Sequence, residues 1–239
     1  MLTTILSGGL IGLIFGFILQ RTRFCLTGGF RDMYIARNNT LFYAFLIAIT
    51  VESIGVLSLI QLGIIGNPYE EFSVLGAIVG SYLFGIGIVL AGGCATGTWY
   101  RAGEGLLGSW VALFFYMTSA AAMKSGFLVP LNQLIAKRWV INDDLAGQLG
   151  IPVWYLLVFL VAITSFIVIR ELRKPRRQIA TLPSKYKGVR HYLFEKTYHK
   201  YFAGFLIGLV ALIAWPASQL TGRVGGLGIT TPSAHLMSY

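Results

Sequence analysis

Long apolar stretches separated by short polar or glycine-rich segments make up most of the 239-residue chain. A helix needs roughly 20 residues to cross a hydrocarbon core of about 30 Å. The stretches that are long enough are 2–19, 41–62, 73–93, 105–129, 153–169 and 203–217. Hydrophobic residues account for 56% of the chain, charged residues for 12%, and the mean hydropathy is +0.71, which exceeds what a soluble core requires. The pattern therefore predicts an all-α polytopic membrane protein with about six spanning helices.

Two of the polar segments repeat one pattern, and each contains one of the chain's two cysteines. Phe15-Gly16 precedes Cys25, and Phe84-Gly85 precedes Cys94, with eight residues between in both cases. A Thr-Gly stretch follows each cysteine, and both residue types are poor helix formers. We therefore expect each spanning helix to break at its cysteine.

A segment too short to span a membrane follows each break, at 30–38 and at 99–104. We expect a broken or re-entrant half-helix hairpin at each place, because non-helical backbone inside a bilayer is tolerated only where it is buried in protein or lines a cavity. Two ordinary loops at the membrane surface are the alternative. Broken helices at matching positions of a repeat indicate a transporter's substrate site, and the repeat predicts that the chain starts an internally repeated fold.

The residues at the breaks favour a sulfur-containing anion. The N-terminus of each half-helix offers free N–H groups and a partial positive charge. A thiol is soft and polarisable, so its natural partner is another sulfur atom rather than a hard oxygen. A single membrane cysteine would be interpreted as a small buried apolar residue, but two at matched positions predict a substrate path through Cys25 and Cys94. The residues expected to support the anion or the hairpins are Arg21, Arg23, Thr27, Arg31, Thr96, Arg101 and Glu104.

Two charged residues lie inside the predicted spans and are functional candidates by default, because burying a charge in a bilayer is costly. Lys124 is near the end of its span, so its ammonium group could reach the interface. Glu52 is deeper and stays a weak candidate.

The distribution of charge predicts the orientation. Ten of the 19 basic residues lie within 170–200, which identifies a cytoplasmic loop by the positive-inside rule. We expect this loop to contact anionic lipid headgroups rather than nucleic acid, and the acidic segment 67–71 to face outward. The predicted organisation is a transmembrane half with two cysteine hairpins (1–169), a basic cytoplasmic loop (170–200) and the start of a second transmembrane half (201–239).

No cofactor or metal site is predicted. Cys25 and Cys94 do not form a Cys-x-x-Cys pair, and the three histidines lie outside the spans without forming a ligand cluster.

The segments Gln20–Tyr34 and Leu90–Gly105 resemble the two signatures of the YeeE/YedE family of sulfur-transport membrane proteins, and the likeness extends to Gly222-Arg223 and Gly228-Ile229-Thr230. The resemblance is strongest to the YeeE-type thiosulfate transporters. It implies an all-helical, multi-pass protein of the bacterial inner membrane that takes up thiosulfate for sulfur assimilation. It also implies that Cys25 and Cys94 pass thiosulfate along a central path through S–H···S contacts, and that a TusA-like sulfur-carrier protein is a possible cytoplasmic partner. Family members continue past 228–230 into further helices with another Gly-Gly-Cys hairpin, so the expectation is that 201–239 is a truncated second half.

Two other functions remain open on the residues alone. In a passive anion channel, serine at either cysteine position would still conduct. In a membrane thiol oxidoreductase, the two cysteines would cycle through a disulfide, although such enzymes usually rely on a Cys-x-x-Cys pair or on exposed thiols. We therefore expect a transporter and not an enzyme.

Overall fold

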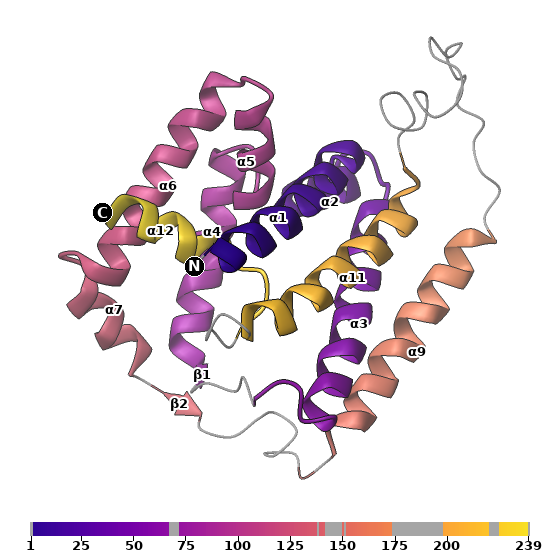
Figure 1. Cartoon of the computed structure of the whole chain (residues 1–239). Coiled ribbons are helices and arrows are strands. Elements are labelled where there is room, and N and C mark those ends of the chain that lie inside the picture. Colours follow the sequence, from indigo (N-terminus) through magenta and orange to yellow (C-terminus); the bar gives the residue numbers. More distant parts are fainter. Residues whose placement is uncertain are drawn as a thin grey trace.

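The computed structural model describes residues 2–66, 72–137, 139–141, 150, 152–173, 198–219 and 225–238. These residues are helical apart from turns and one small antiparallel ladder, β1 (Phe72–Ser73) with β2 (Val140–Ile141). The long helices are α1 (Leu2–Thr22), α3 (Thr40–Gln61), α4 (Val74–Leu90), α6 (Leu107–Ser125), α9 (Val153–Leu172) and α11 (Lys200–Gln219). The short helices are α2 (Leu26–Tyr34), α5 (Ala95–Gly103), α7 (Val129–Ala136) and α12 (Thr230–Ser238). Figure 1 shows their arrangement, and each of the six apolar stretches forms a long helix as predicted.

The helices confirm a polytopic membrane protein. The segments long and apolar enough to cross a membrane are Leu6–Tyr34, Thr40–Gln61, Val74–Gly103, Val153–Leu172 and Lys200–Gln219. Helix α6 together with α7, bent by 73°, makes a sixth candidate. Leu6–Tyr34 combines α1 with α2, and Val74–Gly103 combines α4 with α5, so each cysteine lies at a break within a candidate span.

The half-helices begin earlier than the predicted 30 and 99. Helix α2 starts at Leu26 and α5 at Ala95, directly after the cysteines, so the Thr-Gly stretches lie inside the helices. The prediction overestimated the cost of glycine and threonine there. The first-turn N–H groups have no intrahelical partner in any helix, so poor helix formers are tolerated at that end.

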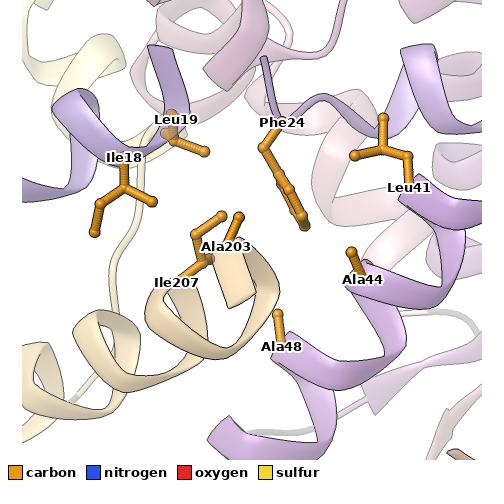
Figure 2. Close-up of a cluster of buried hydrophobic side chains, with 8 residues drawn as sticks. All are labelled: Ile18, Leu19, Phe24, Leu41, Ala44, Ala48, Ala203 and Ile207. Atoms are coloured by element: carbon orange, nitrogen blue, oxygen red, sulfur yellow. The ribbon is translucent and has the colours of Figure 1, made fainter. Parts of the chain in front are cut away.

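The hydrophobic core lies where α1, α3 and α11 meet (Figure 2). Seven of its buried residues come from these three helices: Ile18, Leu19, Leu41, Ala44, Ala48, Ala203 and Ile207. The eighth, Phe24, follows the end of α1. Small residues let α11 approach α3 closely: a Cβ atom at Gly204 would overlap the backbone carbonyl of Ala44, and one at Gly208 would lie 2.8 Å from the Ala48 oxygen.

The outer helices are attached by a few polar contacts. Thr50 Oγ1 of α3 and Thr164 Oγ1 of α9 are 3.0 Å apart and buried. Helix α12 packs on α6, where Tyr116 Oη donates to Thr230 Oγ1 at 2.6 Å. By contrast, α4 has no buried residue.

Both charged residues inside the spans have side-chain partners. Trp215 Nε1 of α11 donates to Glu52 Oε1 at 3.3 Å, and Lys124 Nζ lies 3.0 Å from His235 Nε2 of α12. These contacts join α3 to α11 and α6 to α12, which gives both residues a structural role.

Some predictions fall outside the described residues. These are the acidic segment 67–71, most of the basic loop (174–197), and Gly222-Arg223.

Candidate functional site

Each cysteine is the N-cap residue of a nine-residue helix. Cys25 precedes α2 with φ −144° and ψ 128°, and Cys94 precedes α5 with φ −70° and ψ 167°. The Cys25 carbonyl accepts from Gly29 N at 2.9 Å, and the Cys94 carbonyl accepts from Thr98 N at 2.8 Å. The repeated sequence pattern therefore places a cysteine in extended backbone ahead of a nine-residue helix twice, although only the Cys94 side chain accepts a cap hydrogen bond, from Gly97 N.

The helix before each cysteine ends at a residue with left-handed backbone. At the end of α1 this residue is Arg23 (φ 48°), whose N–H donates to the Gln20 carbonyl, while Phe24 N donates to the Leu19 carbonyl at 3.2 Å. This pair of bonds is a Schellman motif, and Phe24 and Leu19 both belong to the core, as the motif favours. At the end of α4 the left-handed residue is Gly92 (φ 66°).

The two breaks bring the thiols together. Cys25 Sγ and Cys94 Sγ are 3.5 Å apart, although 69 residues separate them in sequence. Both are free thiols; Cys25 is 2% exposed and Cys94 is half-buried. One thiol can therefore donate its S–H to the other, or both can face one bound sulfur atom.

Gly97 makes this approach possible. A Cβ atom at Gly97 would lie 2.8 Å from Cys25 Sγ and 3.6 Å from Cys94 Sγ, closer to the first than side-chain carbons are found. Sequence reasoning did not select Gly97. The available signal was that glycine stands three residues after both cysteines, at 28 and at 97.

A backbone N–H group contacts the sulfur pair. Gly97 N, in the first turn of α5, donates to Cys94 Sγ at 3.4 Å. Helix α2 likewise begins directly after Cys25. Both helices therefore start beside the sulfur pair, and the free N–H groups of their first turns favour a negative charge there.

The hydroxyl groups of two threonines in the first turns after the cysteines differ in their hydrogen bonding. Thr98 is buried, and its Oγ1 donates to the Cys94 carbonyl at 2.9 Å. Thr27 Oγ1 is also inaccessible, but it has no hydrogen-bond partner among the described residues. A buried hydroxyl without a partner is costly, so Thr27 can still satisfy a polar ligand beside Cys25.

The predicted charged residues occupy different places. The Arg101 guanidinium donates to the Gly92 carbonyl, so it holds the end of α4. Glu104 Oε1 accepts from Gln20 Nε2 at 3.2 Å, which ties the end of α5 to the end of α1. Arg31 pairs with its neighbour Asp32 at 3.0 Å and its side chain is 65% exposed. Arg21 is half-buried and Arg23 is exposed.

Helix α5 lies between two cavities. One, of about 970 Å³, lies between α4, α5 and α6; Gly93, Ala95, Thr98 and Arg101 line it near Cys94. It also receives hydroxyl groups from α6. The other, of about 540 Å³, lies between α1, α5 and α12, and Thr96, two residues after Cys94, lines it. Helix α5 therefore separates the two cavities, and Cys94 lies at its N-terminus.

The site combines soft sulfur, free N–H groups and a nearby guanidinium, which together can bind a small anion that carries a soft sulfur atom. The part of the chain that the structure describes contains no group of three or more His, Cys, Asp or Glu side chains able to hold a metal ion.

The known proteins that resemble this chain are named as transporters. The family model described as sulphur transport matches residues 21–239. The chain is 52% identical over 239 residues to the thiosulfate transporter TsuA of Escherichia coli (strain K12), covering 100% of this chain and 68% of that protein. It is 32% identical over 237 residues to TsuA of Spirochaeta thermophila, covering 94% of this chain and 66% of that protein. A 101-residue segment is 43% identical to the probable transporter YedE of Escherichia coli (strain K12), covering 42% of this chain and 25% of that protein. The chain thus spans about two thirds of the length of the two TsuA relatives.

Proposed function

Because the chain belongs to the sulphur transport (YeeE/YedE) family, we propose that it carries thiosulfate into the cell across the bacterial inner membrane for sulfur assimilation. Two relatives that match nearly the whole chain are named thiosulfate transporters, and the helices supply the necessary membrane spans.

The observation that carries the proposal is the 3.5 Å approach of Cys25 Sγ and Cys94 Sγ at two helix N-termini. Thiosulfate has a soft terminal sulfur atom and a charged sulfonate end. A thiol can donate its S–H to the soft sulfur, and the free N–H groups of α2 and α5 can donate to the charged oxygens. The substrate path therefore runs past both cysteines.

The surroundings suggest an order of contacts. Cys94 is half-buried beside the 970 Å³ cavity that Arg101 lines, whereas Cys25 is almost inaccessible. An anion drawn into this cavity meets Cys94 first and then Cys25, where the hydroxyl of Thr27 has no hydrogen-bond partner within the described part of the chain. Of the other predicted residues, Thr96 lies in the first turn of α5, Glu104 ties α5 to α1, and Arg21, Arg23 and Arg31 add positive charge near the first break.

The organisation follows from the same proposal. Residues 1–169 are the transmembrane half with both cysteine hairpins, 170–200 is a basic loop on the cytoplasmic side, and 201–239 starts a second half. The loop would meet anionic lipid headgroups, and a TusA-like sulfur carrier would receive thiosulfate on that side.

Growth of a bacterial strain that lacks thiosulfate uptake tests the proposal. The chain should restore growth on thiosulfate as the only sulfur source, and Cys94→Ser or Cys25→Ser should abolish it, because a hydroxyl is a hard partner for sulfur. All strains should grow equally on cysteine, and membrane levels of the variants should match.

Two results would contradict the proposal. Failure of the unsubstituted chain to restore growth would contradict thiosulfate uptake by this chain. Undiminished growth of Cys94→Ser would contradict the thiol path and favour a passive anion channel.

A further inference from the structure

We propose that Cys25 and Cys94 are also a redox modification site, at which a reversible disulfide closes the path; this inference rests on the proposed function. The sulfur atoms are 3.5 Å apart, and a disulfide bond is about 2.05 Å long. Forming the bond thus requires the two atoms to approach by about 1.5 Å, a movement on the scale of side-chain adjustment.

The surroundings of the thiols allow this movement. Gly97 has no side chain that could enter the space beside Cys25 Sγ, and both cysteines lie in extended backbone just ahead of a helix. Attack requires a thiolate, and the helix N-termini that begin directly after both cysteines, with Gly97 N donating to Cys94 Sγ, favour negative charge there. Cys94 is the more accessible of the two, so it meets an oxidant first.

The fitting oxidant is a polythionate, of which tetrathionate is the simplest probe. Tetrathionate is two thiosulfate groups joined by a sulfur–sulfur bond, so it carries the same soft sulfur and sulfonate groups as the proposed substrate. The site that would bind thiosulfate would therefore present it to Cys94.

The reaction is two successive thiol–disulfide exchanges. The Cys94 thiolate attacks a central sulfur of tetrathionate; a bond from Cys94 Sγ to that sulfur forms, the central bond breaks, and one thiosulfate leaves with the electron pair. The Cys25 thiolate then attacks Cys94 Sγ and expels the second thiosulfate. Two thiols lose two electrons and two protons, the protons pass to water, and tetrathionate is reduced to two thiosulfates.

The disulfide would stop uptake because neither sulfur then carries a hydrogen. The anion loses both S–H donors at the place where α2 and α5 meet, and the two sulfur atoms are held together where the substrate has to pass. A reducing thiol reverses both exchanges and restores the path.

The test uses membrane vesicles that contain the full chain, treated with tetrathionate and then denatured and labelled with a maleimide polymer. The untreated chain should accept two labels. The treated chain should accept none, its Cys25 and Cys94 peptides should be joined with the loss of two hydrogens, and thiosulfate uptake should be lost. Dithiothreitol should restore both labels and uptake.

Matched variants separate the geometry from general thiol chemistry. In Cys25→Ser, Cys94 should keep a thiosulfate-derived adduct and form no cross-link within the chain. Gly97→Ala should slow cross-linking because its methyl group would crowd Cys25 Sγ. Gly28→Ala should leave cross-linking unchanged, since its nearest neighbours would be 3.7 Å away.

The inference is overturned if both cysteines still accept maleimide after tetrathionate, or if the cross-linked chain takes up thiosulfate at the untreated rate. Should the untreated chain take up no thiosulfate, the proposed function fails, and the cross-link alone decides: its formation supports the modification site and its absence overturns it.

Discussion

The first break runs from α1 through Cys25 to α2, and the second runs from α4 through Cys94 to α5. Both place a cysteine ahead of a nine-residue helix, but their surroundings differ. The first is built into the core: Phe24 is 3% exposed and packs with α3 and α11. The second follows a helix with no buried residue and adjoins two cavities. A repeated motif thus supplies two equivalent thiols, while the packing around them makes Cys25 a fixed partner and leaves Cys94 open to approach.

The two breaks also differ in how the preceding helix stops. Gly92 adopts a positive φ without steric cost, whereas Arg23 adopts it with a full side chain, at a cost of about 1–2 kcal/mol. The Schellman bonds and the burial of Phe24 hold Arg23 in place. Core packing thus compensates for backbone strain at the first break, and glycine avoids it at the second.

Alanine at the two equivalent glycines should give the largest difference between the breaks. Gly97→Ala should reduce thiosulfate uptake by about tenfold or more, because overpacking that costs about 1–3 kcal/mol would push Cys25 Sγ away from Cys94. Gly28→Ala is the matched control, with ordinary contact distances of 3.7 Å, and should leave uptake nearly unchanged. Initial rates of radiolabelled thiosulfate uptake at equal protein levels measure both. Equal loss in the two variants would show that the breaks are packed alike.

Removing a guanidinium group should raise the apparent KM for thiosulfate more at the second break than at the first. Arg101→Gln should raise the apparent KM for thiosulfate roughly tenfold, since hydrogen bonds to charged groups contribute about 1.5 kcal/mol or more. Arg31→Gln should change it by less than about twofold, because Arg31 is exposed and pairs only locally with Asp32. Uptake rates measured over a range of thiosulfate concentrations give the apparent KM of both variants. A larger increase for Arg31→Gln than for Arg101→Gln would show that the anion is attracted at the first break instead.

Exchanging residue types at the two left-handed positions should shift stability in opposite directions. Gly92→Ala should lower the free energy of unfolding by about 1 kcal/mol, as a Cβ atom clashes with the backbone at φ 66°. Arg23→Gly should raise it by less than about 1 kcal/mol, because relief of strain is partly offset by the freedom of glycine in the unfolded chain. Thermal unfolding of the detergent-solubilised protein measures both shifts. If Arg23→Gly is destabilising, the Arg23 side chain contributes more than its backbone costs.

The side-chain hydrogen bond between Gln20 and Glu104 should have the smallest effect. Gln20→Met removes the donor to Glu104 and should lower the free energy of unfolding by about 0.5 kcal/mol, because the bond is exposed. Glu104→Gln keeps an acceptor and should be neutral. The same unfolding assay applies. Loss of uptake as large as that of Gly97→Ala would show that this bond, rather than close packing, holds α1 beside α5.

Much of this arrangement could be predicted from the sequence because it depends on local patterns. Apolar length alone located the six long helices, and the matched Phe-Gly to Cys spacing identified both breaks. The starts of α2 and α5 were predicted too late, because glycine and threonine were treated as if they stood in a helix interior.

What the residues could not show depends on contacts between distant segments. Nothing near Gly97 in sequence reveals that Cys25 Sγ lies beside it, and the contact of Thr230 with Tyr116 joins residues 114 positions apart. The role of Arg101 at the Gly92 carbonyl likewise appears only once α5 is placed beside the end of α4.

The missing side chain at Gly97 also constrains how the two copies of the repeat can evolve. A residue at position 28 faces only ordinary contacts, so that copy can accept small substitutions, whereas at position 97 any β-carbon disturbs a sulfur atom that belongs to the other copy. The two copies of the repeat therefore cannot evolve independently. A substitution at position 97 in the second copy affects a cysteine in the first copy, so the two sequences can diverge only while position 97 stays glycine.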